Sequence, residues 1–204
     1  MTHIRSKFFN TGGTHGEFCV SDLIVFSSSG KLGHVAVFWE AVVAQSLLLD
    51  RAHATALSDW AGAAKQAEDP EYGIEATWRA DVLKLSDQYL IRANIFLLLL
   101  SFFEFAVLEV YKLNFGQYPL VERPGLFKDV IEPLKTAGVV GDPPELFVRE
   151  IAGNRDEIRN AFVHGRWNDL KDPTERIDLY EAFCAVSVYF GLVEDKLREK
   201  GIEV

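Results

Sequence analysis

Residues 95–111 of this chain read IFLLLLSFFEFAVLEVY, and this stretch decides the fold. Its side chains are apolar almost all round a helix, and the polar exceptions are Ser101, Glu104 and Glu109. A helix that is apolar on every side has to be buried. The stretch is shorter than the roughly 20 apolar residues that span a bilayer, and two carboxylates would be costly there. We therefore expect it to lie at the centre of a helical bundle and not in a membrane.

The sequence on either side of this stretch predicts further helices. We expect the central helix to run over residues 76–113. Before it, residues 35–67 are rich in Ala and Leu and contain no Pro, and the helix they predict ends before Pro70. After it, the spacing of apolar residues predicts a short helix over residues 124–137, which Pro133 would kink or shorten.

Two more helices are predicted in the second half of the chain. Asp142 can cap a helix whose first turn holds two prolines and whose apolar stripe ends at His164. Gly165 can then take the left-handed conformation that often follows a helix. A last helix opens at Asp172 and runs to about residue 200.

These elements predict a single all-α domain over residues 34–204. Four main helices plus a short one are typical of an up-and-down bundle. The first 33 residues are rich in Gly and Ser, which predicts an N-terminal arm that is either irregular or a small hairpin. At 204 residues, with 49% hydrophobic and 25% charged residues, the chain can bury a core without disulfides or metal.

The composition also limits the partners and cofactors that we expect. A net charge of -9 repels a polyanion over most of the surface, so contact with nucleic acid must depend on a local basic patch. Cys19 and Cys184 stand alone, and the remaining histidines have no metal-ligand spacing. The first 16 residues contain no readable export signal. We expect a cytoplasmic protein that uses no metal and no cofactor.

One short segment, residues 155–167, carries the side chains that could do chemistry. Arg155 and Arg159 lie one helical turn apart beside the apolar stripe, and Asn160 adds an amide next to them. His164 follows in the last helical turn. A histidine changes charge near neutrality, and a guanidinium can bind a phosphate through two hydrogen bonds. Together they are the minimum groups needed to cleave a phosphodiester without a metal.

The same residues have structural interpretations. His164 near a helix C-terminus would stabilise the helix dipole, and Gly165 would be only the cap. The arginines could pair with carboxylates on a solvated face. Trp167, beside the motif, is the aromatic side chain that we expect to be exposed and able to stack on a base, with Arg166 next to it.

The pattern Arg-Asn-x-x-x-His at the end of a bundle helix, followed by Gly, resembles the signature of the HEPN superfamily. The resemblance covers about residues 35–200, because the order of the helices and the place of the motif agree. It implies a helical domain that dimerises so that two Arg/His pairs face one cleft. In many members this cleft cleaves RNA, as a toxin or defence effector. Some toxin members have a Tyr two positions after the His, where this chain has Arg166.

The resemblance implies a role for each matched residue. Arg159 would bind and stabilise the scissile phosphate, and His164 would act as general acid or base. Asn160 matches the polar residue that often follows the Arg. Glu104 matches a Glu that is common on the preceding long helix, and Glu109 competes for that match. Three further residues would support the site or bind RNA: Arg155, Arg166 and Trp167.

The resulting expectation is a metal-independent endoribonuclease of toxin or defence type, with RNA as its substrate. One chain supplies one such His, so a homodimer is part of the expectation, and an antitoxin protein is a candidate partner. Two alternatives remain open. One is a non-catalytic HEPN module that binds RNA, a nucleotide or a protein partner through the same groove. The other is a structural or regulatory helical protein.

Overall fold

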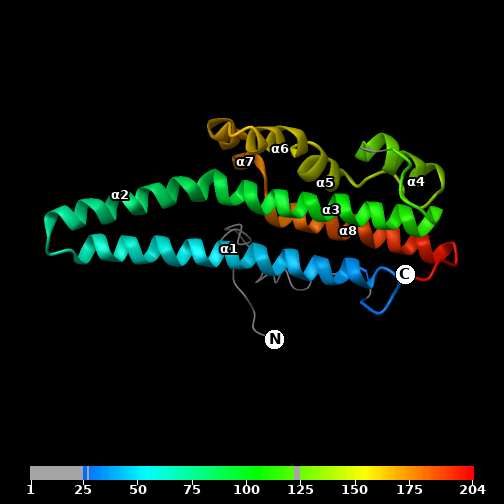
Figure 1. Ribbon diagram of the computed structural model, residues 1–204, viewed down its shortest axis with the longest axis horizontal. Coiled ribbons are helices and arrows are strands. Elements are labelled where there is room, and N and C mark those ends of the chain that lie inside the picture. Colours follow the sequence, from blue (N-terminus) through cyan, green and yellow to red (C-terminus); the bar gives the residue numbers. More distant parts are fainter. Residues whose placement is uncertain (1–24, 27, 122–124) are drawn as a thin grey trace.

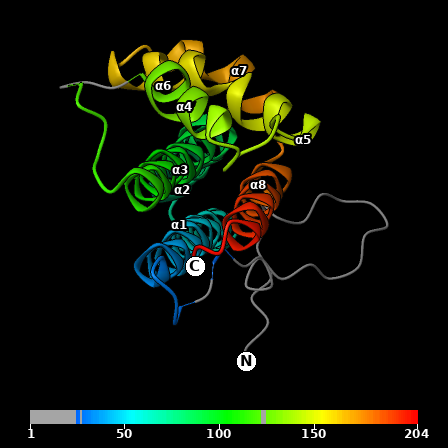
Figure 2. The same cartoon turned by 90° about the vertical axis from the view of Figure 1, so that its right-hand side faces the viewer.

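A computed structural model describes residues 25–26, 28–121 and 125–204. Within these residues every regular element is a helix, so the predicted all-α fold is confirmed (Figure 1). The long helices run side by side along the molecule, and a layer of shorter helices covers one side of them (Figure 2).

The first half of the fold is a long helical hairpin. Helix α1 (Gly33–Gln66) is followed by α2 (Pro70–Ser86), a π-helical turn η2 (Asp87–Ile91) and α3 (Arg92–Phe115). The last three form one continuous helix of 46 residues.

This helix begins at Pro70, earlier than predicted. Proline fits the first helical turn, where its missing N–H is not needed. The side chain of Asp69 accepts a hydrogen bond of 2.9 Å from the N–H of Glu71. This bond satisfies one of the backbone N–H groups that have no partner within the first turn of a helix. Pro70 therefore starts this helix, whereas α1 already ends at Gln66. The far end is Gly116, which takes the left-handed conformation at φ 76°.

The Pro70–Phe115 helix is long and apolar enough to cross a membrane by length and composition alone. However, 61% of its most apolar window is buried inside the fold. A buried core helix can have the same length and composition, so this feature is weak evidence for a membrane span.

The core lies where α3 meets α8 (Leu179–Glu199) and the first half of α1. Phe103 of α3 packs against Phe190 with their ring centroids 5.6 Å apart, and both rings are fully buried. Trp39 of α1 contacts Phe102 at 5.0 Å. Tilted aromatic pairs of this kind add to the free energy gained by burial. The stretch that predicted a buried central helix therefore does lie at the centre.

The covering layer consists of short pieces, where the sequence predicted a short helix over residues 124–137 and one longer helix from Asp142 to His164. Its elements are η3 (Leu126–Ile131), α4 (Glu132–Thr136), α5 (Glu145–Phe147), η4 (Val148–Ala152), α6 (Arg155–Val163), η5 (Trp167–Leu170) and α7 (Lys171–Arg176). The helix predicted to start at Asp142 is broken at Gly153, and Asp142 pairs with Lys135 at 2.5 Å instead of capping it. The last predicted helix is likewise broken, and Asp178 caps α8.

Most of the predicted N-terminal arm, including any hairpin in it, lies outside the described residues. Of the part that is described, Val25 and Phe26 are buried, and Phe26 contacts Phe190 at 5.4 Å. This end of the arm therefore belongs to the core.

Candidate functional site

Helix α6 ends in a hydrogen-bonded cap that fixes where the motif residues lie. Ile158 and Ala161 are buried and hold the helix against the bundle. Gly165 adopts φ 64°, which lets its N–H reach the carbonyl of Phe162 at 3.1 Å. The N–H of Arg166 reaches the carbonyl of Ala161 at 2.9 Å. These paired bonds form a Schellman motif, so the helix ends where the sequence predicts.

Glu104 of α3 binds both arginines of the motif through one carboxylate oxygen. Nη2 of Arg155 lies 2.9 Å from Oε1, and Nη1 of Arg159 lies 3.3 Å from the same atom. The Arg155 side chain is 15% exposed and lies over the ring of Phe127, whereas that of Arg159 is 48% exposed. Nη1 of Arg155 also lies 3.0 Å from Oδ1 of Asp156, so the two guanidinium groups face two carboxylates. Arg159 is the one that a ligand could reach.

His164 is exposed at the end of α6, and no described residue hydrogen-bonds to its imidazole. Its backbone N–H donates to the carbonyl of Asn160 at 3.1 Å, so these two residues follow each other along one line of the helix. Arg159 is five residues before His164, which separates them by roughly 140° around the axis. A site that uses both groups must therefore wrap round the end of α6 or combine two chains.

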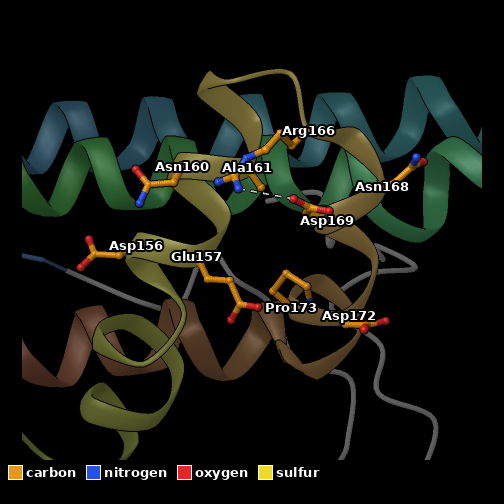
Figure 3. A pocket seen from close by; sticks show the side chains of 9 residues that line it. All are labelled: Asp156, Glu157, Asn160, Ala161, Arg166, Asn168, Asp169, Asp172 and Pro173. Atoms are coloured by element: carbon orange, nitrogen blue, oxygen red, sulfur yellow. Dashed lines mark ion pairs between the residues drawn. The ribbon is translucent and has the colours of Figure 1, made fainter.

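A hollow of about 520 Å³ opens beside α6, between it and the segment that leads to α7 (Figure 3). Its polar lining includes Asn160, Arg166 and four carboxylates: Asp156, Glu157, Asp169 and Asp172. Nη1 of Arg166 lies 3.6 Å from Oδ2 of Asp169 (Figure 3). Four carboxylates and one guanidinium make a poor place for a phosphate.

The hollow separates the predicted site residues into two groups. Asn160 and Arg166 line it, whereas Arg159, His164 and Trp167 do not. Sequence reasoning did not predict this hollow, because it joins Asp156 and Glu157 of α6 to Asp169 and Asp172 from the segment after Gly165, whose fold was not predicted.

Trp167 keeps part of its ring accessible next to the motif. The side chain is 48% exposed and contacts Phe162 edge to face, with ring centroids 5.4 Å apart. Phe162 thus holds the indole in place. The exposed part of the ring could stack on a base.

A second polar cluster, which sequence reasoning did not find, links the start of α1 to the end of α3. Nε2 of His34 lies 3.0 Å from Oε2 of Glu109, and the hydroxyl of Tyr118 donates to the other carboxylate oxygen. Lys112 lies 4.7 Å from the centre of the Tyr118 ring. These residues have no common motif, because 75 positions separate His34 from Glu109.

Glu109 is among the buried residues, and burial by itself raises the pKa of its carboxyl. Hydrogen bonds from Tyr118 and His34, together with the charges of Lys112 and His34, outweigh burial and hold that pKa below its usual 4.5. The cluster contains none of the motif residues. Of the two glutamates that competed for the same match in the sequence, Glu104 contacts the motif arginines and Glu109 contacts His34 instead.

No family model matches the chain, and neither the curated proteins nor the solved structures give a significant match. The resemblance to HEPN proteins therefore rests on the motif and on the order of the helices.

Proposed function

We propose that this protein is a metal-independent endoribonuclease of HEPN type, which acts as a homodimer through Arg159 and His164. One observation carries the proposal. The end of α6 presents an exposed imidazole and, five residues earlier, a half-exposed guanidinium that Glu104 holds in place. These are an acid-base group and a phosphate-binding group on one short, capped helix.

In the proposed reaction, one His164 accepts the proton of a ribose 2′-hydroxyl, and the 2′-oxygen attacks the adjacent phosphorus. The bond from phosphorus to the 5′-oxygen breaks, and His164 of the second copy donates a proton to that oxygen. Arg159 stabilises the charge that develops on the phosphoryl oxygens. The products are a 2′,3′-cyclic phosphate and a 5′-hydroxyl.

Two chains are required for a geometric reason as well as a chemical one. Each chain has one histidine in the motif, whereas the reaction needs an acid and a base. The 140° or so between Arg159 and His164 around the helix also favours a cleft built from two helix ends. In such a cleft Asn160 and Trp167 would contact the RNA, and Arg155 would keep Glu104 in position. We place this activity in the cytoplasm, with an antitoxin as a candidate regulator.

A second candidate function, a non-catalytic HEPN module, is favoured by the charge around the motif. The hollow beside Asn160 is acidic, and the chain carries a net charge of -9. A module that binds a protein partner would use this surface without any need to attract a phosphate.

The experiment that separates these functions is cleavage of a mixed RNA pool in excess EDTA. We would compare the wild type with His164→Ala, Arg159→Ala and the control Arg198→Ala, an exposed arginine that pairs with Glu194 on α8. Circular dichroism would check that each variant is folded, and sedimentation would give its oligomeric state. End-group analysis would identify the cyclic phosphate.

The nuclease predicts cleavage by the wild type and Arg198→Ala, with a loss of at least 100-fold in the two motif variants. No cleavage, together with RNA binding that survives His164→Ala but weakens in Arg159→Ala, would favour the non-catalytic module. A protein that stays monomeric at all concentrations tested would contradict the proposed mechanism.

A further inference from the structure

The second surface that points to a function lies on α2, the part of the helical hairpin that projects past the covering layer (Figure 1). The α1–α2 hairpin extends beyond the remaining helices, and α2 packs mainly against α1 (Figure 1). Burial is described for residues 70–84 of α2, and among these Ala76 alone is buried. Most of this helix therefore faces solvent.

Its outer face carries an apolar stripe. Ile74 is 72% exposed, Trp78 is 63% exposed and Val82 is 41% exposed. These residues follow each other at intervals of four, so they lie on one side of the helix. A single exposed apolar residue needs no explanation, but a row that includes a tryptophan is typical of a binding surface.

The flanks of the stripe are acidic. Glu71 and Asp81 are exposed and lie three residues from Ile74 and Trp78 respectively, hence on the same side of the helix. Neither carboxylate forms an ion pair with a described residue. Lys84, three residues after Asp81, is an exposed cation near one end of the stripe. Arg79 is turned toward α1, because its guanidinium lies 4.5 Å from the centre of the Trp60 ring.

Arg79 is also neutralised where it lies, because its Nη2 is 2.6 Å from Oε1 of Glu75. The stripe thus presents apolar side chains with unpaired negative charge beside them. Such a surface complements an apolar stripe that is flanked by positive charge.

We propose that this face of α2 binds an amphipathic helix of another protein, whose apolar residues pack on Ile74, Trp78 and Val82 and whose Lys or Arg side chains pair with Glu71 and Asp81. The helix would lie along α2, as in helix-in-groove recognition, with contacts every three to four residues. Trp78, at the centre of the stripe, would contribute most to the affinity. The proposal is independent of the proposed nuclease site.

Charge disfavours several other occupants. A parallel pair of α2 helices from two copies would place each carboxylate opposite its own copy, and like charges directly opposite each other are unfavourable. Glu71 and Asp81 also repel an anionic membrane or a nucleic acid. A measurement of self-association distinguishes an antiparallel pair of copies from the proposed partner.

The test uses a synthetic 18-residue helix of Leu and Lys, with Leu on one side and a fluorescent label at its N-terminus. A matched probe has Glu in place of every Lys. Fluorescence anisotropy measures the Kd of each probe for the full-length protein. Three double variants are compared with the wild type: Ile74→Ala/Trp78→Ala, Glu71→Lys/Asp81→Lys, and the control Val188→Ala/Leu192→Ala. The control residues on α8 are similarly spaced and are 47% and 49% exposed.

We expect the wild type to bind the Lys probe at least ten times more tightly than the Glu probe. The Ile74→Ala/Trp78→Ala variant should lose at least ten-fold in affinity, and the α8 control should change less than two-fold. The Glu71→Lys/Asp81→Lys variant should prefer the Glu probe, which a general attraction of Lys to an acidic protein would not produce.

Several results would overturn the proposal. One is equal affinity of the wild type for both probes, and another is an equal loss in the α2 and α8 variants. Self-association that Trp78→Ala abolishes would assign the stripe to a second copy. Binding to phosphatidylcholine vesicles that depends on Trp78, without binding of the Lys probe, would assign it to a membrane.

Discussion

Glu104 and Glu109 lie five residues apart in the same apolar helix, yet they have different surroundings. Glu104 is 29% exposed and receives two guanidinium groups from α6. Glu109 is 11% exposed and is bound by His34 from α1 and Tyr118 from the segment after α3. The first carboxylate holds Arg159, which a ligand can reach. The second holds parts of the fold together.

The difference shows that carboxylates in one apolar helix can have different roles. A helix position fixes the direction of a side chain, but the elements packed on that side decide its partners. On the Glu104 side a short helix brings arginines, and on the Glu109 side the start of α1 brings an imidazole. The predictions below test how far these two roles differ, beginning with the packing that both of them need.

The largest effect is expected from the core that fixes α3. Phe103 lies one residue before Glu104 and is fully buried against α8. Phe103→Ala should lower the free energy of unfolding by about 3–5 kcal/mol, because it removes buried apolar surface and leaves a cavity. Urea unfolding followed by circular dichroism measures this loss. A loss below about 1 kcal/mol would mean that α3 is not the centre of the bundle and would undermine both roles.

Replacement of the buried carboxylate should have the next largest effect. Glu109→Gln removes the charge that His34 and Lys112 face, and hydrogen bonds to charged groups are the stronger ones. We expect a loss of about 1–2 kcal/mol at pH 7. The matched control is Glu68→Gln, an exposed carboxyl at the α1–α2 turn, which should change stability by less than about 0.5 kcal/mol.

The effect of Glu109 should also depend on pH with a definite sign. Its pKa in the folded protein is lower than in the unfolded chain, so the carboxylate contributes stability above about pH 4.5. That contribution disappears as the pH falls through the lowered pKa. The gap between the wild type and Glu109→Gln should therefore close below pH 4.5. A gap that widens there would show that the folded state does not favour the ionised carboxyl.

Glu104→Gln should cost less, about 1 kcal/mol or below, because its ion pairs are partly exposed. The two glutamates should also differ in their response to salt, since ions screen exposed pairs more than buried ones. We expect 1 M NaCl to reduce the effect of Glu104→Gln by more than half and to leave most of the effect of Glu109→Gln. Unfolding in urea at low and high salt gives both values, and equal salt dependence would remove the distinction between the two sites.

The sequence predicted the central helix, the start of α1 within two residues and the end of α6 at His164 and Gly165. At these places the apolar spacing and a neighbouring glycine indicate the same helix boundary. It failed in the covering layer, where residues 142–164 were predicted as one helix. Apolar spacing there continues across Gly153, but an added side chain at Gly153 would lie 3.0 Å from the carbonyl of Arg149. The break therefore depends on local backbone geometry that favours glycine, and it leaves the apolar pattern intact.

The candidate site was predicted better in its parts than in its arrangement. Glu104 was expected near the motif arginines, and the structure brings it to Arg155 and Arg159. The acidic hollow and the His34 cluster were missed, because each joins residues from segments whose relative positions no local pattern encodes. Whether Arg159 and His164 cleave RNA stays a prediction.

The smallest effect on stability is expected from Arg159→Ala. This variant tests whether Glu104 positions a group for a ligand or only stabilises the fold. Arg159 is half exposed, and Glu104 keeps the closer ion pair with Arg155 when Arg159 is lost. The free energy of unfolding should change by less than about 0.5 kcal/mol. Arg155→Ala should cost more than Arg159→Ala, because its side chain is 15% exposed and also packs over Phe127. If Arg159→Ala instead destabilises the fold as much as Arg155→Ala does, both arginines serve structure. Glu104 would then resemble Glu109, and the case for a ligand at Arg159 would be lost.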